Sequence, residues 1–316
     1  MLNEAGVECI FYTHLADVLV HNNEVKAVLL AGLEGTYLLE ADVFADCTGD
    51  AQLCFLANSD SVETVTVDAG MHQSLVFNVG GVTAFDIKYN RARYKELYDK
   101  GLTPERAWAH FSYSSMFNPG VQQVFGCQNS GDPTDSRDMT RMDQELREQN
   151  LEMMKFLRAY MPGYQNCWME QESHRVGVRV SRRIYGLDTI TEDTIFEKST
   201  DTPVALCWRH TGGHANSKKF EAPWFRHKRG VAGIPMGTLI PKAFDNVVVA
   251  GRCISGEFHC IDSYRMMDTC MTTGEAAGLI AYLSISKQKK VQDVSYEELL
   301  PLMKENGFIL APRTCD

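Results

Sequence analysis

The stretch that decides the fold is Asp245-Asn-Val-Val-Val-Ala-Gly-Arg-Cys-Ile-Ser255, which Met271-Thr-Thr-Gly-Glu-Ala-Ala-Gly278 follows closely. Three consecutive valines predict a buried strand, and Gly251 permits a sharp exit from it. The second stretch predicts a helix that begins near Met271 and carries only small residues in its first turns. Small side chains let a flat ligand approach the backbone, and free N–H groups at a helix start favour a carbonyl or an anion. Together the two stretches predict a cofactor-binding cleft.

Nearer the N-terminus, the stretch Ala41-Asp-Val-Phe-Ala-Asp-Cys-Thr-Gly-Asp50 predicts another strand that ends at a glycine. With Asn246 to Arg252 and the Gly274-Glu-Ala-Ala-Gly278 helix, it resembles the FAD-dependent oxidoreductase family of flavoproteins with two dinucleotide-binding domains. The resemblance covers residues from about 5 to about 310, and the order and spacing of the motifs carry it.

The resemblance implies a cofactor and a set of residues that bind it. The Thr-Gly-Asp segment of the family lies near the adenine and ribose end of FAD, its Ala-Gly-Arg segment leads to the flavin, and its helix start points at the ring. The implied FAD-binding residues in this chain are Thr48, Gly49, Asp50, Gly251, Arg252, Thr272, Thr273 and Gly274. A glycine after a strand and an Ala-Gly-rich helix are also common in tight helix–sheet packing without a ligand.

Two further segments resemble the family between these ends. Glu172 to Ile184 is similar to its arginine-rich strand. Gly233 to Pro241 is similar to its Ile-Pro-Tyr-Arg-Ser-Leu-x-Pro segment, with Met236 and Gly237 in place of the aromatic residue and the arginine.

The glycine-rich turn that opens the family, Gly-x-Gly-x-x-Gly, does not occur in the sequence. That turn holds the FAD pyrophosphate. We therefore expect an N-terminally truncated oxidoreductase of the family. The alternative is a non-catalytic remnant or subunit that needs a partner chain to supply the nucleotide-binding half.

Composition excludes several classes of protein. The 316 residues are 44% hydrophobic and 23% charged, and no apolar run approaches the roughly 20 residues of a membrane span. A net charge of −10 argues against a nucleic-acid partner, because a phosphate backbone needs a basic surface. The ten cysteines include no Cys-x-x-Cys pair, and the N-terminus lacks a signal segment, so we expect a cytoplasmic protein without a metal site.

The predicted fold class is α/β, a partial Rossmann-like FAD-binding domain with an inserted α+β substrate lobe. Residues 1–60 are the first part of the FAD-binding domain, with strands at 8–14, 15–20 and 25–30 and a hairpin turn at Asn22-Asn23. Residues 61–230 are the lobe, with a strand at 74–80 and helices at 104–111 and 139–160. The FAD-binding domain resumes over 231–290, and 291–316 hold a last helix with a Ser295–Glu298 capping box and a tail.

The arginine-rich segment predicts an extended strand with Arg175, Arg179, Ser181 and Arg183 on one face. A row of cations suits an anionic substrate or a reduced flavin, although pairing with carboxylates such as Glu170, Glu172 or Asp188 explains it equally well. The family's strand approaches the active site, so we name Arg179 and Arg183 as candidate catalytic residues.

Histidines supply the other candidates. His259 lies in the segment that joins the valine strand to the helix, where relatives carry residues that face the flavin, and it is the candidate acid or base; the alternative is an ordinary loop histidine. His210 and His214 flank a flexible Thr-Gly-Gly turn and could form a general acid/base pair or bind a metal, although such a turn cannot fix two metal ligands as a helix does. Cys253 is either a redox thiol or, more simply, a packed core residue.

The resemblance thus implies hydride or electron transfer between a small-molecule substrate and flavin N5, with a redox partner protein as a further partner. An unpaired half-domain also predicts that the chain associates into oligomers.

Overall fold

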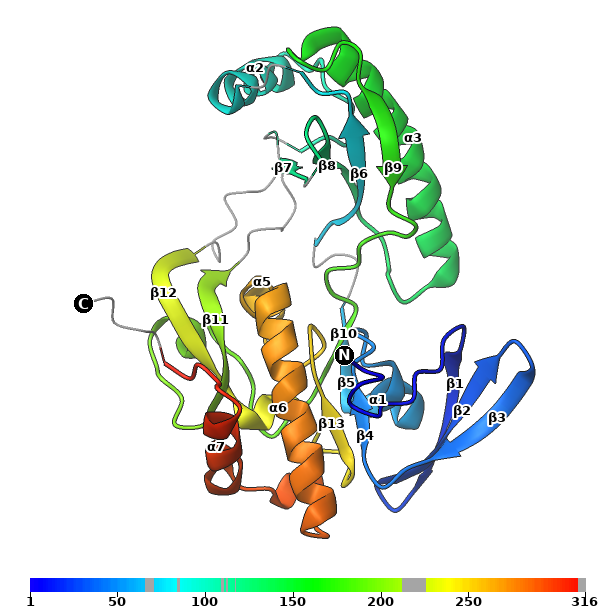
Figure 1. The fold of residues 1–316 in the computed structure, drawn as a ribbon, viewed down its shortest axis with the longest axis vertical. Helices are drawn as coiled ribbons and strands as arrows, with labels where there is room; N and C mark the ends of the chain where they lie inside the picture. The colour runs from blue at the N-terminus through cyan, green and yellow to red at the C-terminus, as the bar shows by residue number, and fades with distance from the viewer. Residues whose placement is uncertain are drawn as a thin grey trace. The chain divides into compact units, whose positions relative to one another are not determined.

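The computed structural model describes residues 1–65, 71–83, 86–108, 111, 113–116, 118–211 and 226–311. These residues form two compact units, which Figure 1 shows as ribbons. The first unit contains the described residues of 1–64, 182–211 and 226–311, and the second contains those of 65–181. The predicted lobe ran over 61–230, whereas 182–211 lie in the first unit because they pair and pack with its strands and helices.

A parallel pair of strands joins the two ends of the first unit. The strand β4 (Phe44–Asp46) pairs with β13 (Val247–Val249), so that Phe44 faces Val247 and Asp46 faces Val249. All three valines of β13 are fully buried, as expected for a strand covered on both faces. The sequence prediction of these two strands is confirmed, and their parallel direction places the ends of both motifs at one edge.

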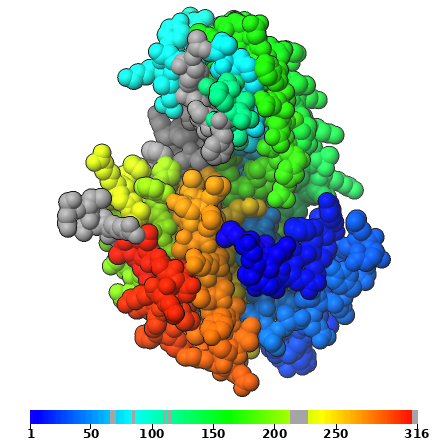
Figure 2. Space-filling view, in the orientation of Figure 1, coloured from blue at the N-terminus to red at the C-terminus, as the bar shows by residue number. Residues whose placement is uncertain are grey.

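The long helix α6 (Met267–Ser286) packs against both of these strands. Its buried residues recur at helical spacing and are mostly small: Thr269, Thr273, Ala276, Ala277, Ile280, Leu283 and Ser284. Small side chains allow the helix to lie close to the strands. Its opposite face forms part of the surface of this unit, beside α7 (Tyr296–Glu305) in Figure 2.

A three-stranded antiparallel sheet precedes the pair, in the order β1 (His14–His21), β2 (Glu24–Gly32) and β3 (Gly35–Glu40). The predicted hairpin turn at Asn22-Asn23 is confirmed, since both residues adopt positive φ, as a tight hairpin requires. The predicted strand over residues 8–14 is wrong. Tyr12 has φ of 56°, which interrupts an extended chain, and β1 begins only at His14.

The Asn246 side chain fastens this sheet to β13. Its Oδ1 accepts from the Val25 N–H at 2.9 Å, and its Nδ2 donates to the carbonyl oxygens of Val25 and Asp42 at 2.8 and 3.1 Å. Because Val25 is buried, the amide supplies hydrogen bonds that water cannot.

Short elements complete the first unit. The antiparallel pairs are β5 (Val62–Thr64) with β10 (Arg182–Ile184), and β11 (Pro203–Thr211) with β12 (Arg226–Pro235). The helices are α1 (Gln52–Ala57), α4 (Glu192–Phe196) and α5 (Ile261–Tyr264), with 3-10 turns η1 (Ser59–Ser61), η4 (Met236–Leu239), η5 (Phe258–Cys260) and η6 (Val291–Asp293). The predicted capping box of α7 is present: Ser295 Oγ accepts from the Glu298 N–H, and Glu298 accepts from the Ser295 N–H.

The second unit is an antiparallel sheet covered by a helix. Its strands follow the order β7 (Tyr113–Ser115), β8 (Gln122–Asn129), β6 (Gln73–Gly80) and β9 (Trp168–Glu172). The helix α3 (Ser136–Tyr160) packs on β6 and β8, and α2 (Ile87–Asp99) contributes Tyr94 and Leu97 to the same core.

Two predictions for this unit are confirmed and one is wrong. The strand at 74–80 is β6, and the helix at 139–160 is α3, which starts three residues earlier because Asp135 caps it. The predicted helix at 104–111 is not formed by its described residues. Residues 105 and 106 form a turn, and Ala107 bridges to Cys127 of β8.

Candidate functional site

A buried carboxylate shapes the loop after β4. Asp46 accepts hydrogen bonds at Oδ1 from the Thr48 N–H (3.1 Å) and hydroxyl (2.7 Å), and at Oδ2 from the Cys54 N–H (3.2 Å). Thr48 Oγ1 in turn accepts from the Gln52 N–H at 3.0 Å, at the start of α1. Thr48 itself is exposed, yet its hydroxyl is bonded within the protein. The loop therefore has a fixed shape.

Arg252 connects this loop to the end of β13. Its Nη2 donates to Asp50 Oδ1 at 2.8 Å. Gly49 has φ of +76°, and a Cβ there would lie 2.7 Å from Arg252 Nη1, so only glycine lets the guanidinium lie across the loop. The Nε of Arg252 is buried and has no hydrogen-bond partner.

We call the surface formed by Thr48, Gly49, Asp50, Gly251 and Arg252 the paired-strand edge. The family resemblance assigns the first three residues to one end of FAD and the last two to the other. In the structure Asp50 and Arg252 are in direct contact, so the two motifs form one surface. It lies at the carboxyl ends of parallel strands, where open α/β sheets bind ligands.

Gly251 and the helix α6 meet at this edge. The Gly251 N–H donates to Thr273 Oγ1 at 3.2 Å, and that hydroxyl donates to the carbonyl oxygen of Cys270 at 3.0 Å. Gly251 has φ of +86°, and a Cβ on either Gly251 or Gly274 would meet no atom within 4 Å. The space beside these two glycines is therefore open.

The predicted start of the helix is wrong, which changes how its residues can act. The helix begins at Met267 and not near Met271. The N-cap residue Met266 makes no side-chain cap, so no capping signal in the sequence marks this start. The N–H groups of Thr272, Thr273 and Gly274 lie in the second turn, where the helix itself uses them. They therefore cannot face a ligand as free donors, and this part of the sequence prediction is wrong.

The arginine-rich segment does not form the predicted strand. Arg182–Ile184 forms a strand, whereas residues 173–181 are irregular apart from a single antiparallel bridge between Gly177 and Ser74. Arg179 belongs to the second unit, where its Nη2 donates to Ser74 Oγ at 3.0 Å, its Nη1 to the carbonyl oxygen of His72, and its backbone N–H to Gln73 Oε1. Because a side chain of β6 holds this segment, no ladder of strand hydrogen bonds sets a common face for the arginines.

Arg183 is a fully buried cation in the first unit. Its Nη2 pairs with Glu63 Oε2 at 2.5 Å and its Nε donates to the Gly256 carbonyl oxygen at 2.7 Å, whereas its Nη1 has no partner. Tyr264 lies close by, since a Cβ on Gly256 would approach its hydroxyl to 2.8 Å. That hydroxyl is buried and also lacks a partner. The sequence suggested Glu170, Glu172 or Asp188 as ion-pair partners of the arginines. In the structure the partner of Arg183 is instead Glu63.

His259 lies in η5 with two carboxylates in front of one ring nitrogen. Its Nε2 is 3.3 Å from Glu257 Oε2 and 3.5 Å from Glu192 Oε1. About a third of its side chain is exposed to solvent. Sequence reasoning missed both glutamates; Glu192 is far away in the sequence and no local pattern indicates it.

The remaining candidates contribute less. His210 lies in β11, next to the ring of His227, and its partner in the predicted pair, His214, lies outside the described residues. Cys253 is fully buried, and burial together with the charge of Asp46 raises the pKa of its thiol far above the usual range. A thiol held in its neutral form is a poor nucleophile. This favours the core role over the redox role.

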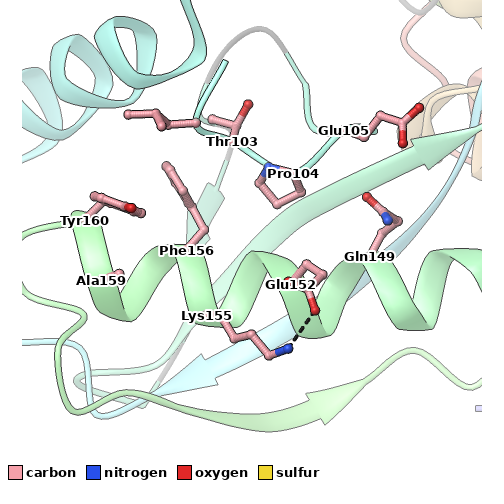
Figure 3. A pocket seen from close by; sticks show the side chains of 10 residues that line it. Thr103, Pro104, Glu105, Gln149, Glu152, Lys155, Phe156, Ala159 and Tyr160 are labelled. Carbon is pink, nitrogen blue, oxygen red and sulfur yellow. Dashed lines mark hydrogen bonds and ion pairs between the residues drawn. The ribbon is translucent and has the colours of Figure 1, made fainter. Parts of the chain in front are cut away.

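Two cavities lined by described residues lie away from the predicted site. One of about 420 Å³ lies in the second unit between α3 and residues 102–105, lined by Phe156, Tyr160 and their neighbours (Figure 3). Another of about 470 Å³ lies at the opposite, amino-terminal ends of β4 and β13. Neither cavity contains residues of the paired-strand edge.

No helix among the described residues is both long and apolar enough to cross a membrane.

Comparison with known proteins identifies a family. The family model described as FAD dependent oxidoreductase matches residues 1–302. A search of curated proteins found no significant match.

Several solved structures resemble the chain at low identity. A geranylgeranyl bacteriochlorophyll reductase-like protein from Thermoplasma acidophilum has a TM-score of 0.44 and 10% identity, over 93% of this chain and 54% of that one. The flavin-dependent brominase Bmp2 gives 0.42 and 12%, over 96% and 56%. L-proline dehydrogenase from P. horikoshii gives 0.33 and 12%, over 97% and 57%. The chain spans about half the length of these proteins.

Proposed function

Because the chain belongs to the FAD-dependent oxidoreductase family, we propose that it is an oxidoreductase that binds FAD at the paired-strand edge and acts on a small-molecule substrate. FAD is the cofactor of this family. When bound, it supplies the redox chemistry, exchanging a hydride or electrons with the substrate at flavin N5.

One observation carries the proposed location. The Nε of Arg252 is buried without a partner, and buried guanidinium donors are normally satisfied. It belongs to the residue next to Gly251, beside which there is open space. An unpartnered donor and an open space in adjacent residues together support placing an oxygen or ring nitrogen of FAD at this edge.

The other residues of the edge would then have supporting roles. Asp50 orients the guanidinium of Arg252, and Gly49 leaves room for it. Thr273 fixes the Gly251 backbone through its hydroxyl, and Gly274 keeps a flat surface open on α6. Thr48 fixes the loop, and Thr272 is half-buried one residue from Thr273. None of these roles needs the N–H groups at the helix start.

Arg183 and His259 are our proposed substrate-side residues. Arg183 holds a fixed positive charge with one donor, Nη1, that has no partner, and such a donor can stabilise negative charge on a substrate oxygen. His259 can accept or donate a proton at Nε2, held between Glu192 and Glu257. We leave Arg179 out of this set because its hydrogen bonds to His72 and Ser74 explain its burial without a substrate.

A second candidate function is a subunit whose nucleotide-binding half comes from elsewhere. The sequence contains no Gly-x-Gly-x-x-Gly turn to hold the pyrophosphate. Large apolar side chains of the first unit are exposed, including Phe11 (76%), Leu19 (58%) and Leu38 (56%). We propose that a glycine-rich segment outside these 316 residues covers part of this surface, and that the chain by itself binds FAD weakly.

The test is the flavin content of the purified chain, followed by titration with FAD. We expect little FAD after desalting and saturable rebinding that quenches the flavin fluorescence. A preparation with one tightly held FAD per chain would contradict the second candidate. Absence of any saturable binding would contradict the first.

A further inference from the structure

Four side chains with metal-binding atoms meet on the first unit, where η5 approaches the first turn of α4. The ligand atoms of Glu257, His259 and Cys260 all lie within 4.8 Å of one another. Glu192, from α4, lies 3.5 Å from the same His259 nitrogen that Glu257 approaches. The set comprises one imidazole, one thiol and two carboxylates.

We propose that Glu192, Glu257, His259 and Cys260 form a binding site for a divalent cation of the Zn²⁺ type. Nitrogen and sulfur donors together with carboxylates are the ligands of zinc, whereas Mg²⁺ and Ca²⁺ take oxygen ligands. The site goes beyond the proposed flavin chemistry, does not require bound FAD, and would replace the acid–base role proposed above for His259.

The spacing of the donor atoms fits a tetrahedral ion. Bonds of about 2.0–2.1 Å to nitrogen and oxygen and about 2.3 Å to sulfur require neighbouring ligand atoms to be roughly 3.3–3.7 Å apart. The observed separations are 3.3 Å and 3.5 Å from His259 Nε2 to Glu257 Oε2 and Glu192 Oε1, and 3.9 Å from Cys260 Sγ to Glu257 Oε2. The ligand atoms of Glu257, His259 and Cys260 form the compact part of the set, and Glu192 Oε1 joins it through its approach to His259 Nε2.

The backbone holds the two contributing segments together. The Ile190 N–H donates to the Ser255 carbonyl oxygen at 3.1 Å, and the Glu257 N–H donates to the Ile190 carbonyl oxygen at 2.8 Å. The Glu192 N–H also donates to Glu257 Oε2 at 3.1 Å, an outer contact of the kind that orients ligating carboxylates. The site is therefore preorganised by contacts that do not require the ion.

The partial exposure of three of the four side chains lets an ion enter the site from solvent. The side chains of Glu192, Glu257 and His259 are 31–41% exposed, and Cys260 lies fully buried beneath them. An ion entering from solvent would meet the carboxylates and the imidazole first. Binding at Cys260 then forms a metal–sulfur bond, and the thiol proton passes to solvent.

Metal binding and acid–base catalysis by His259 exclude each other, because both use Nε2. The alternative to a metal is that protonated His259 forms an ion pair with both glutamates. In that case Cys260 is only a packed thiol, and removing it would not change the affinity for metals.

Cobalt titration of the full chain, after chelator treatment and with its thiols reduced, tests the site. We expect one Co²⁺ per chain, the strong visible absorption of a tetrahedral site and a thiolate-to-cobalt charge-transfer band, all of which one equivalent of Zn²⁺ removes. Cys260→Ala should abolish the charge-transfer band and weaken the affinity by about 10-fold or more. The matched control is Cys167→Ala, another buried thiol, in the second unit, which should bind as the wild type does.

Two results would overturn the site: a wild-type chain without a charge-transfer band, or Cys260→Ala with an unchanged band. If Cys260→Ala does not fold, His259→Gln and Glu192→Gln provide the same test, each with an expected loss of tetrahedral absorption. The FAD titration is a separate measurement, so failure of the metal site and failure of the flavin site are distinguishable.

Discussion

Replacing Arg252 by alanine should separate ligand binding from stability. In the structure the Arg252 guanidinium makes one ion pair, with Asp50 at 2.8 Å, and the two side chains are 29% and 36% exposed. Exposed pairs of this kind contribute at most about 1 kcal/mol, so the loss of folding free energy should be small. The buried Nε has no partner to lose within the protein.

The effect on FAD should be much larger. A hydrogen bond from a charged donor contributes about 1.5–3 kcal/mol, and every 1.4 kcal/mol is a factor of ten in affinity. We therefore expect Arg252→Ala to raise the Kd for FAD by about 10- to 150-fold, measured by flavin fluorescence titration, with the free energy of unfolding changed by about 1 kcal/mol or less.

The matched control is Arg93→Ala in the second unit. Arg93 is 33% exposed and pairs with Glu96 at 2.9 Å, so it matches Arg252 in exposure and in having one ion pair but is not part of the unit that holds the proposed site. Its replacement should leave FAD affinity unchanged. The reasoning is refuted if Arg252→Ala binds FAD with wild-type affinity, or if both variants lose affinity equally.

Three further predictions follow from single contacts. Gly274→Val should abolish flavin binding while leaving the melting temperature nearly unchanged, because the added Cβ would meet no atom within 4 Å outside the adjacent residues and the helix backbone. Glu275→Ala, an exposed neighbour on α6, is the control, and retained flavin binding in Gly274→Val would mean that α6 only packs against the strands. Asn246→Ala should lower the free energy of unfolding, measured by urea denaturation, by about 1–3 kcal/mol because it leaves buried backbone groups of Val25 unpaired. The control Asn306→Ala, at an exposed helix end, should lower it by less than about 0.5 kcal/mol, and equal losses in the two variants would contradict the prediction. Glu298 has its pKa lowered from 4.5 to about 2 by Lys289 and Lys287, so its stabilising effect is present above about pH 4.5 and is lost as the pH falls through about 2. Glu298→Gln should therefore lower the melting temperature at pH 7 but not at pH 2, whereas the control Glu305→Gln, at an exposed position, should lower it at neither pH. A loss of melting temperature in Glu298→Gln that does not depend on pH would rule out the charge of Glu298 as its cause.

The paired strands were predictable because their signals are local. An unbroken run of valines before Gly251 and the Asp46-to-Asp50 segment each indicate a strand that ends at a glycine. The contact between Asp50 and Arg252 was not predictable, since it depends on which strands are neighbours in the sheet. The true start of α6 was also hidden, because Met266 gives no capping signal.

The arginine-rich segment shows why alternation can mislead. Alternating residues from Arg175 to Arg183 fit a strand, but the Gln73 side chain accepts the Arg179 N–H where a neighbouring strand would. The segment also passes from one compact unit to the other between Ser181 and Arg182. A boundary of that kind depends on tertiary packing, and so does the meeting of Glu192 with His259.

The most direct test of the paired-strand edge is hydrogen–deuterium exchange of the 316-residue chain with and without saturating FAD. We predict slower exchange in peptides that cover residues 46–52, 250–254 and 270–275, and unchanged exchange at residues 102–105 and 149–160, which line the cavity of the second unit. Protection confined to that cavity, or no protection anywhere at saturating FAD, would contradict the account.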